Sequence, residues 1–454
     1  MSFKYNSILS QKKILYLPIE IYSREFYSKL YLAFEASLKG YVVLIGPEYN
    51  INLFIKFLPK GFYLGNGFHL KASNFAKIAK SYGHIVLSHD EEGLVRLKSK
   101  YYREYRVNDS IEKFSDYLLC WGRNHSKILK NFFKKKKILS VGNHRIDLLN
   151  NANFLFSSEV KSIKKKFGNY VLINGSFGSA NHMNGENYLL KNLEERGWFD
   201  DTKKKNYQLR RIAFQKKIFY QMMNLSIDIA RSGQKVLVRP HPSENIRIWK
   251  NYTKEFSDKI KIIRSGNVIP WIIASKLIIH NGCTTAIESY LLKKQIISFR
   301  PFVEKNVESI LPNALGVTLS KKKEIVEFIK NFKEGDKYDV NFNLNSFIEK
   351  TNLNHNFTNR FLSLLSSIHL KNKKKKLFII KFFLLKIFSI KQKLSFFKNK
   401  KNLTYLYSKC PKLKINKVKT FLTLVSKLKN YQKKINVAPF DSHSIIIFQS
   451  KKTK

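Results

Sequence analysis

Short apolar runs alternate with amphipathic stretches along the first third of the chain. Runs rich in Val, Ile and Leu predict strands at 13–20, 41–46, 84–88, 117–121 and 138–141. Between the first two, Phe26, Leu30, Phe34 and Leu38 recur at helical spacing, and Gly40 follows as a C-cap. This order predicts a βαβ unit, and therefore a parallel sheet with right-handed crossovers. The first half is predicted to be Rossmann-like, with its loops on one edge of the sheet.

The same pattern restarts after a charged stretch at 157–168, which we interpret as a linker region. Strands are predicted at 170–173, 235–239 and 260–264, with a long amphipathic helix at 212–232. The stretch 277–301, LIIHNGCTTAIESYLLKKQIISFRP, indicates a strand, a turn, a helix and a further strand. Two facing Rossmann-like domains with a cleft between them are therefore predicted, at 1–155 and 156–335, followed by a third region at 336–454.

The third region, 336–454, is predicted to be a basic helical tail. Its apolar segment 377–390, LFIIKFFLLKIFSI, is interrupted by Lys381 and Lys386 and is too short to span a bilayer. Lysine stems can snorkel, so a helix within 371–400 lying on an anionic membrane surface is the favoured interpretation. A helix packed against the catalytic domains, a nucleic-acid contact and a partner protein are the alternatives.

Charge and cysteine usage narrow the class of protein. The 454 residues carry 84 Lys and Arg against 32 Asp and Glu, a formal net charge of +52, which normally suggests nucleic acid or an anionic membrane. Lys far outnumbers Arg, however, a bias that an AT-rich genome imposes on solvated surfaces. No recognised nucleic-acid motif is present, and no nucleic-acid partner is expected. The three cysteines lie far apart in the sequence, which predicts a reducing compartment and no structural zinc site. The chain has no secretory pattern and no long apolar run, so a cytoplasmic protein is predicted.

The first candidate site is the acidic loop HDEEG at 89–93, which follows a predicted strand. Three adjacent carboxylates, Asp90, Glu91 and Glu92, repel one another, which tends to raise the pKa of at least one toward the range useful for a general base. An acidic helix N-terminus, favoured by the helix dipole, is the structural alternative.

The second candidate site is RPHPSE at 239–244, after the predicted strand KVLV. Two prolines make the turn rigid, and Arg239 and His241 emerge from it as possible donors to a phosphate or a leaving oxygen. A histidine in an ordinary turn is the alternative.

The third candidate site is the turn at 281–285. Asn281 and Gly282 allow close approach of the backbone, and Thr284 and Thr285 occupy a helix start, where unpaired N–H groups attract anions. An ordinary helix cap is the alternative.

A general base in one domain and a phosphate site in the other is what transfer of a group from a nucleotide donor to a hydroxyl requires. No DxD-like metal pair appears in a credible place, so no metal is predicted, and Arg239, His241 and the helix start can replace one.

These three motifs together resemble those of bacterial sialyltransferases and polysialyltransferases with the GT-B fold. From about residue 14 to 332 the chain looks even more like the bacterial surface carbohydrate biosynthesis protein family, and capsule Kdo transferases and CDP-glycerol glycerophosphotransferases share the later motifs. The residues that carry the resemblance are Arg24-Glu25, DEEG at 90–93, GNHRIDLL at 142–149, RPHPSEN at 239–245 and HNGCTTAIES at 280–289.

The resemblance implies a role for each motif. Glu92 is the expected general base, with Glu91 as its substitute, and His241 is the expected donor to the phosphate that leaves. Thr284 and Thr285, with Gly282, Asn281 and Arg239 beside them, are expected to bind the donor phosphate, and Arg24 and Glu25 are expected on the acceptor side.

The resemblance also implies an activity. A metal-independent inverting glycosyltransferase of surface polysaccharide assembly is expected, with a CMP-linked sugar as donor substrate, a glycan or lipid-linked glycan as acceptor, and no cofactor. A CDP-polyol phosphotransferase and a nucleotide-sugar epimerase on the same fold are the closest alternatives.

Overall fold

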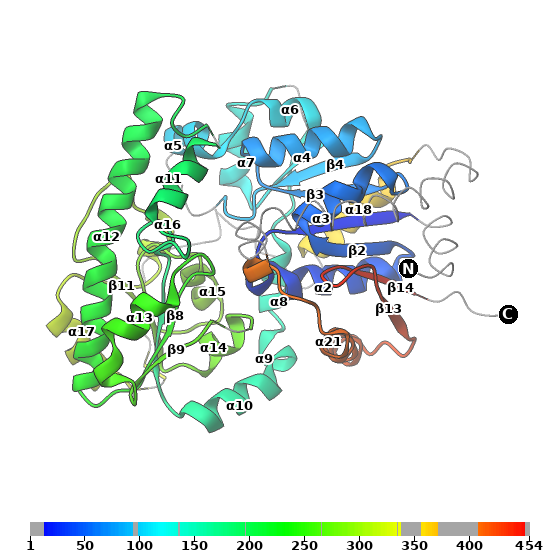
Figure 1. Cartoon of the computed structure of the whole chain (residues 1–454). Helices are drawn as coiled ribbons and strands as arrows, with labels where there is room; N and C mark the ends of the chain where they lie inside the picture. Colours follow the sequence, from blue (N-terminus) through cyan, green and yellow to red (C-terminus); the bar gives the residue numbers. More distant parts are fainter. Residues whose placement is uncertain are drawn as a thin grey trace. The chain divides into compact units, whose positions relative to one another are not determined.

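The computed structural model describes residues 13–93, 99–134, 137–195, 197–264, 266–333, 335–336, 356–370 and 407–449 (Figure 1). The chain forms two compact units. Unit 1 comprises Met1–Gly93, Arg106–Asn151 and Leu344–Lys454, and unit 2 comprises Leu94–Tyr105 and Ala152–Asn343. Each unit is an α/β domain built on its own, mainly parallel sheet, as expected from the sequence.

Unit 1 is built on an eight-stranded sheet in the order β13-β14-β2-β1-β3-β4-β5-β6. Strands β1 to β6 are parallel, and β14 pairs antiparallel with both β2 and β13. The strands are β1 (Ile14–Ile19), β2 (Val42–Pro47), β3 (Phe62–Asn66), β4 (Ile85–His89), β5 (Tyr117–Cys120), β6 (Lys137–Ser140), β13 (Ile435–Pro439) and β14 (Ile445–Gln449).

Helix α2 (Tyr22–Leu38) is largely buried in unit 1. Phe26, Leu30 and Phe34 face the core at helical spacing, as predicted, and the fully buried side chain of Lys29 lies among them. The other helices are α3 (Glu48–Phe54), η1 (Ile55–Phe57), α4 (Leu70–Ser81), α6 (Ser110–Phe114), α7 (Arg123–Lys130), α8 (His144–Leu149), α18 (Phe357–Ser367) and α21 (Ile415–Leu428).

The C-terminal region adds strands as well as the expected helices. Ile445, Ile446 and Ile447 pair with β2, so the hairpin β13–β14 covers the edge that β2 presents. The approach is close at Gly46, where a Cβ atom would lie 2.2 Å from Ser444 Oγ. The described residues of 344–454 are therefore grouped with unit 1, whereas the sequence predicted a separate helical tail at 336–454.

Unit 2 has a six-stranded parallel sheet in the order β12-β11-β10-β7-β8-β9. The strands are β7 (Val171–Asn174), β8 (Val236–Arg239), β9 (Ile260–Ile262), β10 (Leu277–His280), β11 (Ile296–Phe299) and β12 (Val317–Leu319). The helices are α5 (Ser99–Arg106), α9 (Ala152–Leu155), α10 (Ser157–Phe167), α11 (Glu186–Glu194), α12 (Thr202–Arg231), α13 (Ile246–Tyr252), η2 (Lys254–Phe256), α14 (Ile269–Ala274), α15 (Thr285–Leu291), α16 (Ile310–Ala314) and α17 (Lys322–Asn331); the last residue of α5 falls in unit 1.

Side chains along each strand of unit 2 point alternately to the two faces of the sheet, so the hydrophobic core is divided into two clusters, one on each face. Val171 and Ile173 of β7 join one cluster with α12 and α17, while Leu172 joins a second with α10 and α14. The stretch predicted as a linker at 157–168 is thus helix α10. Ile163 packs in the second core cluster because apolar residues recur along this helix at helical spacing.

No helix within the described ranges is long and apolar enough to cross a membrane. The predicted membrane-surface segment, 371–400, lies outside the described residues, so that prediction stays untested.

Candidate functional site

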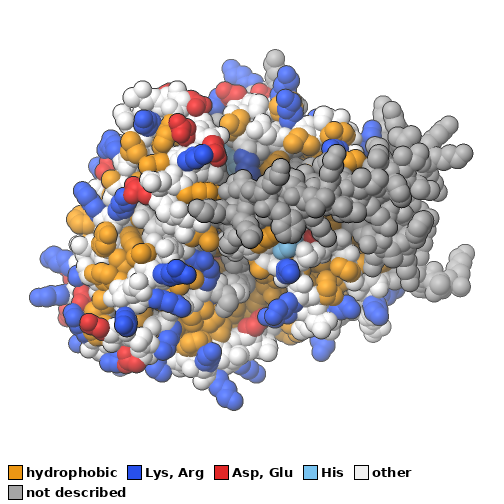
Figure 2. All heavy atoms as spheres, viewed as in Figure 1, with side chains coloured by type: hydrophobic (Ala, Val, Ile, Leu, Met, Phe, Trp, Pro, Cys, Tyr) orange, Lys and Arg blue, Asp and Glu red, His pale blue; other side chains and the backbone are white. Residues whose placement is uncertain are grey.

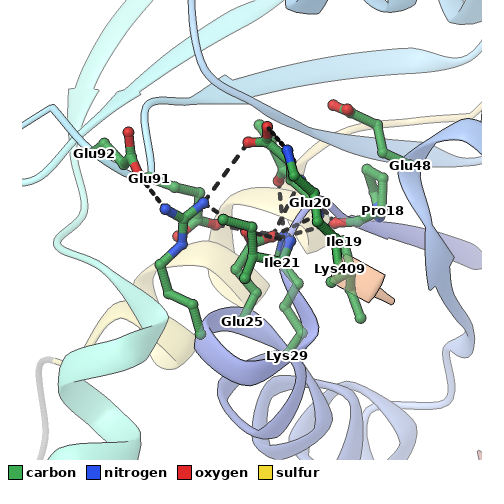
Figure 3. Close-up of polar contacts among 12 residues, drawn as sticks. Pro18, Ile19, Glu20, Ile21, Glu25, Lys29, Glu48, Glu91, Glu92 and Lys409 are labelled. Carbon is green, nitrogen blue, oxygen red and sulfur yellow. Dashed lines mark hydrogen bonds and ion pairs between the residues drawn. The ribbon is translucent and has the colours of Figure 1, made fainter. Parts of the chain in front are cut away.

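A buried lysine organises the strand ends of unit 1. Lys29 Nζ donates to the carbonyl of Pro18 at 2.6 Å, to Asn66 Oδ1 at 2.7 Å and to Glu25 Oε2 at 3.0 Å. Pro18 and Asn66 belong to β1 and β3, the neighbouring strands between which the chain order reverses. Such a switch point is where open parallel sheets form their ligand crevices. Figure 3 shows Lys29 and Glu25 on α2 beside Glu91 and Glu92, which belong to the acidic loop that follows β4.

Glu25 is enclosed by donors. Its carboxylate accepts the backbone N–H groups of Glu20 and Ile21, both at 3.1 Å, and a 2.8 Å bond from Arg24 Nη2. With none of its surface exposed, Glu25 holds the start of α2 and neutralises Lys29. This structural role accounts for a carboxylate here, and its predicted contact with an acceptor stays a prediction.

Glu91 is likewise buried, between a histidine and a lysine. His144 Nε2 lies 2.6 Å from Glu91 Oε1, and Lys29 Nζ lies 3.5 Å from the same oxygen. Burial favours the protonated acid, but His144 and Lys29 together hold the pKa of Glu91 well below its ordinary value. The rise in pKa expected from three adjacent acids is therefore absent at Glu91, because Glu91 contacts Lys29 and His144, which the local sequence does not place there.

Glu92 is the most exposed acid of the loop. Its side chain is 33% exposed, compared with 5% for Glu91 and 1% for Asp90. Arg24 pairs with Glu92 Oε1, and Arg106 Nη1 lies 3.1 Å from Oε2 while its Nη2 lies 2.7 Å from Asp90 Oδ1. Its greater solvent exposure favours Glu92 over Glu91 as a general base. Both carboxylate oxygens of Glu92 are, however, paired with guanidinium groups.

The switch point of unit 2 lies between β7 and β10. Asn174 and His280 are register partners at the ends of these strands, and Arg239 pairs with Asn174 from the other side. Asn174 Nδ2 and His280 Nε2 are buried, and neither has a hydrogen-bond partner among the described residues. His280 Nδ1 faces the backbone N–H of Cys283 at 3.5 Å, which places the proton of the neutral ring on Nε2. Two unused donors therefore lie side by side at the switch point.

Burial of His280 predicts an acid-sensitive unit 2. Burial lowers the pKa of His280 from 6.5 to about 3, so between these values the unfolded chain binds a proton that the folded chain does not. Stability therefore falls as the pH is lowered through this window, by about 1–2 kcal/mol between pH 7 and pH 5. Urea unfolding of His280→Gln should show a shallower pH dependence by this amount. The exposed His369→Gln is the control, and an unchanged slope in His280→Gln would refute the assignment.

The loop after β8 fixes the tautomer of His241. The backbone N–H of Ser243 donates to His241 Nδ1 at 3.2 Å, so the proton of the neutral ring is on Nε2. Glu244, fully buried, accepts the N–H of His241 at 2.7 Å and of Phe177 at 3.0 Å and so ties this loop to the one after β7. His241 is therefore held as an Nε2–H donor at the carboxyl edge of the sheet.

Arg239 is held by its surroundings. Its Nη2 donates to the carbonyl of Gly266 at 3.0 Å, and its guanidinium lies 5.2 Å from the ring centre of Trp271. Burial lowers its pKa to about 10. Arg239 remains cationic at neutral pH and supplies positive charge near the β8 end; its predicted contact with a phosphate stays a prediction.

The third predicted site is a tight turn onto α15. Gly282 has a φ of +63°, and its N–H donates to Asn313 Oδ1 at 2.7 Å, while Asn281 Nδ2 donates to the carbonyl of Phe299 at 2.7 Å. These groups shape the turn. The predicted phosphate contacts of Asn281 and Gly282 therefore compete with bonds already made within unit 2.

Thr284 is the N-cap of α15, as predicted, but its side chain makes no capping bond. The N–H of Thr285 bonds to the Cys283 sulfur, whereas the N–H of Thr284 has no acceptor within the described part of unit 2. The Thr285 hydroxyl lies 3.0 Å from Cys283 Sγ, and burial raises the pKa of that thiol, so Cys283 is a packed residue. The open backbone donor of the turn is therefore the N–H of Thr284.

Each unit thus collects its predicted residues at one sheet edge. Unit 1 joins Arg24, Glu25, Glu91 and Glu92, and unit 2 joins the His241 loop and the Thr284 turn at the carboxyl ends of strands flanking β7. Sequence reasoning missed Lys29, Arg106 and Asn174 as members of these sites, and it quoted His144 and His280 within motifs without giving either a definite role. The signal for Lys29 is its position four residues after Glu25 in an otherwise apolar helix face.

Comparison with known proteins gives structural likenesses only. No family model matches the chain, and no curated protein matches its sequence. The UDP-GlcNAc 2-epimerase of Methanocaldococcus jannaschii, in complex with UDP-GlcNAc and UDP, is 15% identical with a TM-score of 0.47, covering 78% of this chain and 100% of its own. The wall teichoic acid polymerase TagF is 12% identical with a TM-score of 0.43, covering 85% and 91%. Anabaena Alr3699/HepE, in complex with UDP and glucose, is 9% identical with a TM-score of 0.39, covering 70% and 89%. At these TM-scores the likenesses carry no conclusion about the chemistry of this chain.

Proposed function

We propose that this protein is a metal-independent glycosyltransferase that moves a sugar from a nucleotide donor to a glycan hydroxyl in surface polysaccharide assembly. The observation that carries the proposal is the clustering of donors at the β7–β10 switch point of unit 2. Asn174 and His280 offer unused donors there, and the turn before α15 offers the backbone N–H of Thr284. Such a set of donors suits the phosphate of a nucleotide.

His241 is the proposed donor to the leaving phosphate. An Nε2–H held by the Ser243 contact to Nδ1 stabilises negative charge as the sugar–phosphate bond breaks, at no cost of reorganisation. Arg239 adds a fixed positive charge on the neighbouring strand. These groups take the part that a metal ion plays in other transferases.

Glu92 is the proposed general base. An acceptor hydroxyl must first replace Arg24 or Arg106 at one carboxylate oxygen, after which Glu92 takes the hydroxyl proton as the oxygen attacks the sugar carbon. The displaced arginine is then available to an anionic group on the acceptor. This coupling makes proton removal depend on acceptor binding.

The donor is proposed to be CMP-linked, on the motif resemblance alone. A product-resolved screen tests this: purified protein is given CMP-, CDP- and UDP-activated sugars and CDP-glycerol with an acceptor glycan. We expect CMP release with transfer of a sugar. Formation of a phosphodiester would assign the polyol-phosphate alternative, and an isomerised sugar nucleotide without transfer would assign an epimerase.

A further inference from the structure

A basic groove lies on unit 1 between helix α21 and strand β13, away from the strand ends described above. Its volume is about 850 Å³, within the range of binding sites for small molecules and short oligomers. The lining includes Lys419 and Lys427 from the helix and Lys433 and Lys434 from the turn that follows it. In Figure 2, blue basic side chains lie over the region of α21.

The positive charge of this groove is not balanced locally. All four lysines are exposed, and none pairs with a carboxylate within the described ranges. The sequence from 411 to 440 contains no Asp or Glu. Four like charges around one concave surface repel one another, and an anionic ligand relieves that repulsion.

The remaining lining mixes polar side chains with the apolar Leu422, Ile435 and Val437. Asn430 and Gln432 present amides, and Thr423 presents a hydroxyl. Tyr431 fixes the turn, since its N–H donates to Ser426 O at 2.8 Å and its carbonyl accepts from Ser426 Oγ at 2.7 Å. The backbone of this turn is therefore held in place before any ligand arrives, which lowers the entropy cost of binding.

We propose that this groove binds a segment of an anionic polysaccharide. The lysines pair with its carboxylate or phosphate groups, and the amide and hydroxyl side chains bind its ring hydroxyls. A concave surface suits a chain better than a flat bilayer. The lining contains no arginine and only one aromatic side chain, so it lacks the stacking surfaces typical of single-stranded nucleic-acid sites. The proposal concerns polymer binding and holds whether or not the strand-end site proves to be a transferase.

The test measures binding of a fluorescent oligogalacturonate to the full-length protein at roughly physiological salt. The groove variant carries Lys419→Gln, Lys427→Gln, Lys433→Gln and Lys434→Gln. The matched control removes the same charge from exposed lysines of α10, with Lys161→Gln, Lys164→Gln, Lys165→Gln and Lys166→Gln. We expect the dissociation constant to rise about tenfold in the groove variant and less than about twofold in the control.

Three further probes separate the ligand classes: polyglutamate with the same number of carboxylates, single-stranded DNA, and anionic phosphatidylglycerol vesicles. We expect the groove substitutions to weaken the binding of each of these probes less than they weaken binding of the oligosaccharide. Equal losses in the groove and control variants would show binding by bulk charge and overturn the proposal. If polyglutamate, DNA or vesicles lost as much affinity in the groove variant as the oligosaccharide does, that result would also overturn the proposal.

Discussion

Glu92→Gln should lower turnover by about 10²–10⁴-fold, the range that a general base contributes. The amide keeps the size of the side chain and still accepts from Arg24, but it cannot take a proton from an acceptor hydroxyl. Because Glu92 is 33% exposed, the substitution should leave the melting temperature close to that of the wild type. Steady-state kinetics and a thermal melt of the same preparation make the measurement.

Two variants sharpen this prediction. Glu104→Gln removes a carboxylate of similar exposure that pairs with Lys203 on another part of the chain, and it should turn over normally. Glu91→Gln removes a buried partner of His144 and should reduce stability more than Glu92→Gln does. Normal turnover in Glu92→Gln, with full loss in Glu91→Gln at preserved stability, would exchange the proposed roles of the two acids.

Lys29→Met should lower the free energy of unfolding of unit 1 by about 3–5 kcal/mol, since two buried carboxylates lose the cation that lies between them and keep only Arg24 and His144 as side-chain partners. Glu25 is fully buried and Glu91 nearly so, and Lys29 also satisfies the Pro18 carbonyl and Asn66 Oδ1. Urea unfolding, followed by hydrogen exchange of unit 1 amides, measures the loss.

The matched control for Lys29→Met is Lys216→Met, whose ion pair with Glu186 lies on the surface at 2.8 Å and should contribute only about 0–1 kcal/mol. Adding Glu25→Gln and Glu91→Gln to Lys29→Met should recover part of the loss, because the uncompensated charges are then removed. A loss in Lys29→Met no greater than in the control would mean that the buried network does not hold the strand ends.

Much of the fold could be predicted because buried parallel strands have continuous apolar sequences. Strands β8 and β10 are such runs, and both were predicted within a residue or two of their ends. Strand β3, FYLGN, was missed because Gly65 and Asn66 make it resemble a turn, and β12 has only three residues. The hairpin β13–β14 was missed because its partner, β2, lies almost 400 residues earlier in the chain.

The candidate sites could be predicted as motifs but not as networks. Residues that follow strands were expected at one sheet edge, because parallel strands share their carboxyl ends. The contacts of Glu91 with Lys29 and His144, and the pairing of Asn174 with His280, depend on strand order and on the switch points. Strand order and switch points cannot be read from local sequence. The contacts that depend on them decide which acid is accessible and which donors are unused.

The central claim is that the β7–β10 edge of unit 2 binds the phosphate of a cytidine nucleotide, and ligand-induced thermal stabilisation tests it most directly. Wild type and His241→Ala are melted with CMP, CDP, UDP or GDP at saturating concentration. The account predicts that CMP raises the Tm of the wild type by roughly 2–5 °C and that this shift is largely lost in His241→Ala. Selective stabilisation by UDP or GDP would contradict the cytidine assignment, and the absence of any nucleotide shift would contradict the donor site itself.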